Sequence, residues 1–281
     1  MSNIAIIVDS TAYIPEELIK KYKIHVIPQI LHWNRKNFLD GVDIKPVDYY
    51  QRLQIASEIP TTSQPSAGEF ADFIKEVNKK ADSILAILIS DKLSGTLDSA
   101  YSAKDMLPGI QIEIVDSMST SMGLGWIALA SAKAAEQGKP FEQVVKLAKS
   151  LVPKSRMIFV VDTLEYLHKG GRIGGAKRLM GTVLSVKPLL HLQDGRIEPL
   201  ASPRTKQKAI TQMLDIIEDE IKGNENVRMA VINALAQEDA ANLMEVIQRR
   251  FNPIELIKAD MSPVIGTHVG PGTVGVAWLP D

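Results

Sequence analysis

The sequence predicts an α/β protein with two domains, and three observations lead to this class. Short, wholly apolar runs alternate with segments of helical spacing in the first part of the chain, a pattern typical of strands buried on both faces of a parallel sheet. After about residue 170 glycines become frequent and a strand–turn–strand pattern follows. A length of 281 residues also suits two units of about 150 residues each.

In the first part of the chain, each apolar run precedes a helical segment. Residues 4–8 form the first strand and residues 15–23 the first helix, with Pro15 suited to a first helical turn. Residues 24–42 mix apolar and polar positions, which predicts a hairpin-like excursion. The same pairing of strand and helix recurs at 84–89 with 95–107, 112–115 with 124–136, and 157–161 with 164–168. We therefore predict an N-terminal α/β domain with a parallel sheet over residues 1–160.

The rest of the chain predicts a second α/β domain over residues 161–281, with a boundary near 160. Two short strands, 185–192 and 196–200, are joined by a turn at Asp194-Gly195. Further along lie two amphipathic helices and three strands, which would complete a second sheet: helices 205–222 and 239–251, and strands 227–232, 254–259 and 273–279.

Composition and charge exclude several classes of protein. The 32 Lys and Arg against 33 Asp and Glu give a net charge of -1, with 45% hydrophobic residues, as in ordinary soluble globular proteins. The basic residues are scattered among acids, which argues against a nucleic-acid binder. The absence of cysteine removes disulfides and thiolate chemistry. No apolar run approaches the roughly 20 residues that span a bilayer, and no basic leader opens the chain, so we expect a cytoplasmic protein.

Acidic residues follow three of the predicted strands. Asp9, Asp116 and Asp162 each stand directly after an apolar run, with Ser or Thr next to them. The carboxyl ends of strands in open α/β sheets form the ligand crevice, so we expect the three along one edge of the sheet. Taken singly, each also fits a helix cap, because its oxygens accept from unpaired amides of a first turn.

Two hydroxyl-rich segments predict an anion site. Ser94, Gly95 and Thr96 stand at the start of a helix, where free amides and the helix dipole favour an anion and glycine permits close approach. Residues 61–66, Thr-Thr-Ser-Gln-Pro-Ser, form the second segment. Its alternative is a solvated loop with Ser66 as a helix cap.

His268 is a candidate binding residue because it lies in a segment, 266–272, that is rich in glycine and poor in apolar residues. A histidine in such a loop is typical of binding loops, although a surface histidine without a role fits equally. His25 and His32 are seven residues apart, and the sequence contains no H-E-x-x-H pattern. We predict no metal site.

The enzyme motifs that we tested are either absent from the sequence or lack the neighbouring strands and helices that they require. Residues 270–275 match G-x-G-x-x-G by letters, but they precede a strand close to the end of the chain. Residues 123–128 match a looser form without the expected following strand. The sequence contains no G-x-x-x-x-G-K-[ST], G-x-S-x-G or S-x-x-K pattern, so it offers neither a P-loop nor a recognisable serine nucleophile.

Seven motifs in order across nearly the whole chain resemble those of the DegV family of bacterial fatty-acid-binding proteins, whose members include the acyl-carrying subunit of fatty acid kinase. They are Asp-Ser-Thr at 9–11, Asp-Gly-Val-Asp-Ile at 40–44, Thr-Ser-Gln-Pro-Ser at 62–66, Leu-Ser-Gly-Thr at 93–96, the segment 163–173 with Lys-Gly-Gly-Arg, Lys-Pro-Leu-Leu at 187–190, and His-Val-Gly-Pro-Gly-Thr at 268–273. Here Leu97-Asp98 follows Ser-Gly-Thr where relatives often have an aromatic residue and a glutamine.

The resemblance implies a parallel sheet in the first domain, a mainly antiparallel sheet in the second, and a long-chain fatty acid between them. It implies that Thr62 and Ser94 bind the carboxylate beside Gly95, with His268 and Arg172 nearby. Each buried methylene of the tail contributes about 0.8 kcal/mol, so the pocket should be long and apolar. The candidates for lining it, which also fit an ordinary core, are Met118, Met122, Leu124, Met180 and Leu184.

The resemblance also implies a carrier without catalytic residues of its own and without a cofactor. Such a protein would present the carboxylate to the ATP-binding subunit of a fatty acid kinase, carry the acyl phosphate, and contact membrane surfaces transiently. Arg172 and Arg204 are candidates for contacting that partner, because a guanidinium pairs two oxygens at once. The alternatives are a hydrolase or transferase with Ser94 as nucleophile and His268 as base, and a sensor of small anions with a short polar pocket.

Overall fold

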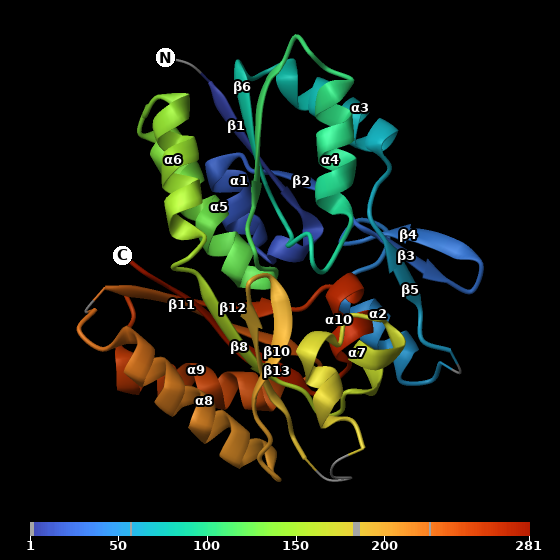
Figure 1. Ribbon diagram of the computed structural model, residues 1–281, viewed down its shortest axis with the longest axis vertical. Helices are drawn as coiled ribbons and strands as arrows, with labels where there is room; N and C mark the ends of the chain where they lie inside the picture. Colours follow the sequence, from blue (N-terminus) through green and yellow to red (C-terminus); the bar gives the residue numbers. More distant parts are fainter. Residues whose placement is uncertain (1–2, 57, 182–185, 225) are drawn as a thin grey trace.

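The computed structural model describes residues 3–56, 58–181, 186–224 and 226–281. It contains a parallel sheet and a mixed sheet, one below the other in Figure 1, with helices packed against both. The predicted α/β class is confirmed. No helix in the described part of the chain is long and apolar enough to cross a membrane.

The first sheet is wholly parallel and has the strand order β2-β1-β6-β7. Its strands are apolar on both faces because helices cover both. Figure 1 shows these strands running toward the second sheet, so their carboxyl ends face it. The strands are β1 (Ile4–Asp9), β2 (His25–Ile27), β6 (Ser83–Leu88) and β7 (Gln111–Asp116).

Alternate residues of these strands point to two different sets of helices. Ile7 and Ala86 pack with α3 (Ala67–Asn78) and α4 (Thr96–Asp105). Ile6, Val8 and their neighbours on β6 pack on the other side, in a cluster that contains α5 (Ser121–Glu136). The helices α1 (Glu16–Tyr22) and α6 (Phe141–Leu151) contact α5.

The second sheet has the order β10-β9-β8-β13-β11-β12, and every neighbouring pair is antiparallel except β11 with β12. This confirms the expectation of a mainly antiparallel sheet. The helices α8 (Lys206–Ile221) and α9 (Gln237–Phe251) cover one face. The strands are β8 (Arg156–Val160), β9 (Leu189–Gln193), β10 (Arg196–Ala201), β11 (Val227–Ala234), β12 (Glu255–Asp260) and β13 (Thr273–Pro280).

One predicted strand lies in a different sheet from the one expected. The apolar run 157–161 corresponds to β8, which pairs antiparallel with β9 and β13 in the second sheet and does not extend the parallel sheet. Burial on both faces makes a strand apolar throughout in either sheet, so its composition does not distinguish them. The division of the chain into domains at residue 160 stays a prediction.

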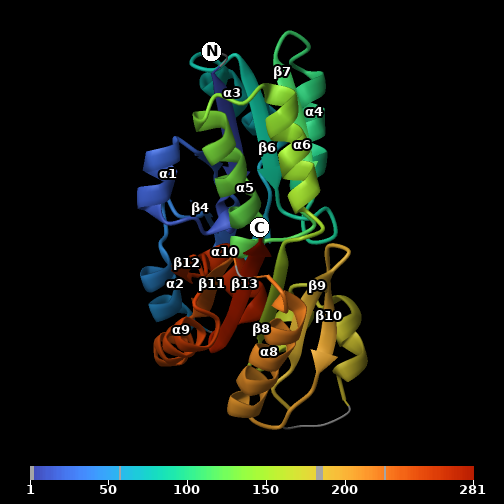
Figure 2. The same ribbon diagram turned by 90° about the vertical axis from the view of Figure 1, so that its left-hand side faces the viewer.

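A small three-stranded sheet, β4-β3-β5, lies beside the two large ones and supplies part of the site. It contains the predicted hairpin, β3 (Ile30–Trp33) and β4 (Lys36–Leu39), with β5 (Thr61–Ser63) on the other side of β3. Nearby in Figure 1 are the helices α2 (Pro46–Leu53), α7 (Glu165–Lys169) and α10 (Pro263–Val269), and Figure 2 shows α2 and α10 below β4. Short 3-10 turns cover Ser10–Ala12 and Gly174–Leu179.

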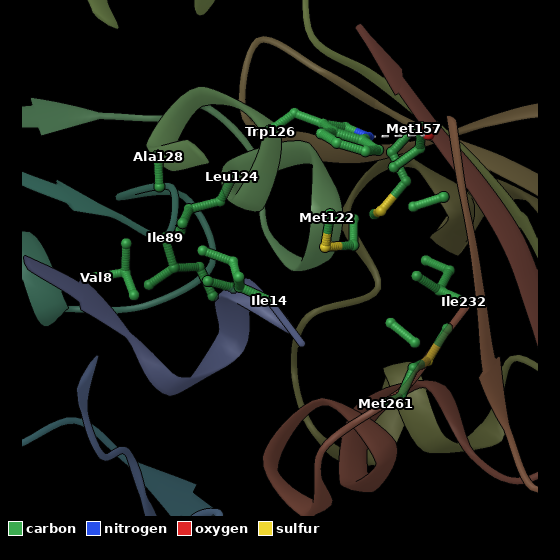
Figure 3. Close-up of a cluster of buried hydrophobic side chains, with 14 of the residues drawn as sticks. Val8, Ile14, Ile89, Met122, Leu124, Trp126, Ala128, Met157, Ile232 and Met261 are labelled. Atoms are coloured by element: carbon green, nitrogen blue, oxygen red, sulfur yellow. Dashed lines mark hydrogen bonds between the residues drawn. The ribbon is translucent and has the colours of Figure 1, made fainter. Parts of the chain in front are cut away.

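The helix α5 connects the cores of the two large sheets. It carries small and apolar residues almost all round, and most of its side chains are buried. Figure 3 shows Leu124 on the side of α5 near Ile89, and Trp126 beside Met157 of β8. The Trp126 Nε1 donates to the Ala277 carbonyl on β13 at 3.3 Å. The carboxyl end of the parallel sheet is therefore packed directly against the second sheet.

Candidate functional site

Four of the residues singled out in the sequence line one cavity between the large sheets. Thr62 is on β5, Ser94 precedes α4, Arg172 follows α7, and His268 is in the last turn of α10. The space free of protein atoms there is about 750 Å³, including its part open to solvent. We call the cluster of Thr62, Ser94, Arg172 and His268 the polar seat.

His268 lies on a helix, which corrects the expectation of a flexible loop. Ser262 and Pro263 begin α10, and the glycine-rich segment 266–272 starts in the middle of this helix. The His268 side chain is buried, and its Nε2 is 2.7 Å from Thr62 Oγ1. Burial lowers the pKa of His268 to about 4, with the nearby Arg172 charge contributing. The imidazole is therefore neutral near pH 7 and acts as a hydrogen-bonding group.

Ser94 is connected to the neighbouring strand edge through Thr96. The Gln29 side chain donates from Nε2 to Thr96 Oγ1 at 2.9 Å, and Thr96 Oγ1 is 2.9 Å from Ser94 Oγ. Thr96 accepts from Gln29 and keeps its own hydrogen, and either hydroxyl can donate in the Ser94–Thr96 contact. The order in which Thr96 donates to Ser94 leaves the Ser94 hydrogen for a ligand. Gly95 is the N-cap of α4 and lies against the Gln64 side chain.

Arg172 supplies the positive charge of the polar seat. Its Nε donates to the Leu93 carbonyl at 3.1 Å and its NH1 to the Gly170 carbonyl at 2.8 Å. The guanidinium is thereby oriented by both walls of the cavity: Leu93 is next to Ser94, and Gly170 ends α7. An anion in the cavity would meet one fixed cation and several hydroxyl donors.

The polar seat is also reached from outside. A second cleft shares Thr62, Arg172 and His268 with the cavity, and Lys169 and Glu58 line it as well. The shared residues place the polar seat where the cavity meets the outer cleft. Arg204, the other candidate for a partner contact, is exposed and lines neither.

The apolar part of the cavity is formed by residues that the sequence did not single out. They come mainly from the second sheet and from α10: Met157, Phe159, Leu192, Ile197, Ile232, Val264, Ile265 and Val269, together with Ile89, Leu93, Leu167 and Met261. The apolar character of these positions is visible in the sequence, but only the tertiary fold shows that they face a cavity.

The residues expected to line the tail do not line this cavity where the structure describes them. Met122 and Leu124 are fully buried in the core, and Figure 3 shows Met122 between α5 and Ile232. Met118 and Met180 are 42% and 40% exposed. Met122 and Leu124 are therefore ordinary core residues, and Met118 and Met180 are partly exposed surface residues. Leu184 lies outside the described residues.

The acidic residues after the strands do not form one cluster. Asp9 and Asp116 end β1 and β7 of the parallel sheet, whereas Asp162 follows β8 in the second sheet and binds Lys187 at 2.8 Å. Asp9 is buried and accepts from the Ile89 and Thr11 amides and from the Thr11 hydroxyl. Asp9 is therefore the N-cap of the 3-10 turn Ser10–Ala12, as the capping alternative predicted.

The geometry does not provide a nucleophile and base pair. The His268 Nε2 is hydrogen-bonded to Thr62 and the Ser94 hydroxyl to Thr96, so no Ser94–His268 hydrogen bond occurs among the described residues. Within the same residues, no group of three or more His, Cys, Asp or Glu is arranged to hold a metal ion.

The chain is similar to known proteins over nearly its whole length. A family model described as "Uncharacterised protein, DegV family" matches residues 3–281. A DegV domain-containing protein of Clostridium acetobutylicum is 37% identical over 284 residues, covering 99% of this chain and 98% of the relative.

Two solved structures have the same fold. The structure that shows fatty acid binding of a DegV family protein from Thermus thermophilus has a TM-score of 0.94 at 32% identity, and covers 99% of this chain and 100% of that one. The structure of DegV, a fatty acid binding protein from Bacillus subtilis, has a TM-score of 0.93 at 32% identity and covers 100% of both chains.

Proposed function

The chain belongs to the DegV family, and we propose that it binds one long-chain fatty acid, with the carboxylate in the polar seat and the tail in the apolar part of the cavity. The observation that carries this proposal is the arrangement of the cavity lining. A cation, two hydroxyls and a neutral imidazole meet at one end, and the rest of the lining is mainly apolar.

The chemistry of the polar seat suits a carboxylate. A bound carboxylate selects the order in which Thr96 donates to Ser94 and Ser94 donates to the ligand, and Arg172 provides the compensating charge. A bound carboxylate selects the His268 tautomer with its hydrogen on Nε2, because His268 then donates to Thr62 and leaves the Thr62 hydrogen for the ligand. Each charge-assisted hydrogen bond contributes about 1.5 to 3 kcal/mol.

The tail accounts for most of the affinity. Each methylene removed from water contributes about 0.8 kcal/mol, so the tail of a 16-carbon acid outweighs the head group. A small anion without a tail would leave the apolar lining unused. This favours a fatty acid over the alternative of a small-anion sensor.

We further propose that the protein is a carrier whose bound carboxylate is phosphorylated by a separate ATP-binding kinase subunit. In that step a carboxylate oxygen attacks the γ-phosphorus of ATP, the bond to ADP breaks, and the acyl phosphate stays on the carrier. The outer cleft beside the polar seat gives a partner access to the carboxylate. The sequence contains no P-loop of its own, which agrees with delegation of the nucleotide to a partner.

The substitution Ser94→Ala tests the carboxylate site. We expect the Kd for a long-chain fatty acid to rise about tenfold to a hundredfold, because a charge-assisted hydrogen bond is lost, with little change in melting temperature. The matched control is Ser99→Ala on the same helix, since Ser99 does not line the cavity. An unchanged Kd together with a much lower melting temperature would assign Ser94 a structural role.

The carrier role is tested with a purified fatty acid kinase and ATP. We expect Arg204→Ala to reduce acyl phosphate formation while fatty acid binding stays nearly intact, and Arg172→Ala to reduce both. The exposed Arg249 on α9 provides the control substitution. Normal acyl phosphate formation with the Arg204→Ala variant would show that Arg204 does not contact the kinase. Consumption of ATP or an ester by the isolated protein, abolished by Ser94→Ala, would replace the carrier with an enzyme.

A further inference from the structure

The parallel sheet has an open edge at the start of β1. The edge strand β2 pairs only with residues 7–9 of β1, whereas β6 pairs with β1 from Ile4 onward. Residues 4–6 therefore pair with a described strand on one side only. The Asn3 carbonyl accepts from the Asp82 amide beside β6. Because backbone groups alternate between the two sides of a strand, the amide and carbonyl of Ile4 face the open side.

The strand β2 is short because of the way the chain enters it. The helix α1 ends at Tyr22, and Lys23 has a φ of 51°, in the left-handed region that turns the chain sharply. The chain joins the sheet only at His25, opposite Ile7. The first part of β1 is thereby left without a second neighbour among the described strands.

A cleft lies where a longer β2 would run. Ile4, Ala5 and Ile6 of β1 line it, together with Val77 of α3 and Ala132 of α5, the helices that cover the two faces of the sheet. An added strand of three residues, about 10 Å long, would continue β2 along β1 here. The remaining lining residues are Asn3, Lys21, Tyr22, Lys23, His25, Lys80, Ala81, Ala135 and Glu136.

This edge cleft is separate from the fatty acid site. Figure 1 shows the start of β1 at the end of the parallel sheet that points away from the second sheet. In the described lining, the edge cleft shares no residue with the cavity or with the outer cleft beside the polar seat. An occupant of the edge cleft would therefore not compete with a ligand in the cavity.

The charge of the edge cleft is positive. Lys21, Lys23 and Lys80 are exposed and form no salt bridge with a described residue. Glu136 is the one acid in the described lining. Burial lowers the pKa of His25, with the nearby Lys80 charge contributing, so His25 is neutral near pH 7. Three cations against one anion favour an occupant with negative charge.

We propose that the edge cleft binds an extended acidic segment of another protein, which pairs with residues 4–6 of β1 as an added strand. Backbone hydrogen bonds give such a strand affinity without selecting its sequence. The selection comes from Lys21, Lys23 and Lys80, which attract acidic side chains and repel basic ones. Exposed ion pairs are weak and screened by salt, so the affinity falls as the ionic strength rises.

The test selects ligands for the purified protein from a phage-displayed library of random peptides. We expect the selected peptides to be rich in Asp and Glu, and their synthetic copies to bind more weakly at higher salt. Replacing Lys21, Lys23 and Lys80 together by Glu should raise the Kd at least about tenfold, because attraction becomes repulsion. Three exposed lysines outside the edge cleft, replaced together by Glu, form the matched control and should leave the Kd unchanged: Lys139, Lys146 and Lys154.

Hydrogen exchange of the Ile4 amide distinguishes strand addition from a purely electrostatic contact, and a bound peptide should slow this exchange. Selection of no acidic peptide, or an equal Kd for the unmodified protein and the variant without the three cleft lysines, would overturn the inference. Peptide binding that leaves the Ile4 exchange unchanged would contradict the added strand. Dimerisation of the protein that disappears in the same variant would assign the edge to a second copy of this chain and would also contradict the proposal.

Discussion

At the residue scale, the polar seat separates charge from hydrogen bonding. His268 is neutral because burial and Arg172 lower its pKa to about 4, so Arg172 alone supplies positive charge. His268 instead orients Thr62 through the 2.7 Å contact. An exposed histidine with an ordinary pKa would change its charge near neutral pH, whereas this seat keeps the same charge across that range.

The buried carboxyl group of Asp40 makes the stability of the protein depend on pH. Its carboxylate is 2% exposed and accepts from Ser10 Oγ at 2.6 Å. Burial raises the pKa of Asp40 from 3.8 to about 7, although hydrogen bonds from Ser10 and Ser262 oppose the shift. The folded protein therefore binds this proton more tightly than the unfolded chain, and the contribution to stability is lost as the pH rises from about 4 to about 7.

The substitution Asp40→Asn should remove this loss. Relative to the unmodified protein, we expect the variant to gain stability as the pH rises from 5 to 8, by about 3 kcal/mol, because about two pKa units at about 1.4 kcal/mol each fall in this range. Urea unfolding at several pH values measures the difference. The exposed Asp105, replaced by Asn, serves as control. A stability difference between Asp40→Asn and the unmodified protein that stays constant from pH 5 to 8 would contradict this account.

At the element scale, the packing of α7 against α10 positions His268. Gly170 ends α7, and a Cβ at this position would collide with His268 Nδ1. The φ of Gly170 is -77°, which suits any residue, so only the close approach requires glycine. The end of α7 therefore packs closely against the imidazole ring of His268.

The substitution Gly170→Ala should displace His268 and weaken fatty acid binding about tenfold, because Thr62 loses the group that orients it. Titration with a fluorescent fatty acid gives the Kd. Gly68→Ala, in α3 where a Cβ meets open space, is the control: it should stabilise the fold by about 0.5 to 1 kcal/mol and leave the Kd unchanged. Unaltered binding by Gly170→Ala would show that the position of His268 is not critical.

The elements show what could and could not be predicted from the sequence. Runs of apolar residues identified the strands because this signal is local. The two hydroxyl-rich segments were also visible locally, and the resemblance to a known family selected Thr62 and Ser94 within them. The sheet to which β8 belongs depends on distant partners, β9 and β13. The sequence analysis predicted a loop around His268 because glycines are frequent there. It missed the helix, although Ser262 and Pro263 form an ordinary helix start. The cavity lining follows from packing that no local pattern encodes.

At the scale of the whole molecule, several parts of the fold combine to line an amphipathic cavity. The polar seat contains Ser94 from the loop after β6, Thr62 from β5, Arg172 after α7 and His268 from α10, and the second sheet with α10 provides most of the apolar lining. The carboxyl ends of parallel strands are the usual ligand site of α/β sheets, and here the second sheet closes that site against water. A ligand with a charged head and an apolar tail matches this division.

Native mass spectrometry of the freshly purified protein, followed by extraction of its lipids, tests the central claim most directly. We predict a mass excess equal to one long-chain fatty acid per chain, the same fatty acid in the extract, and a reduced excess for Ser94→Ala but not for Ser99→Ala. A protein that carries only its own mass, with no fatty acid in the extract above background, would contradict the account.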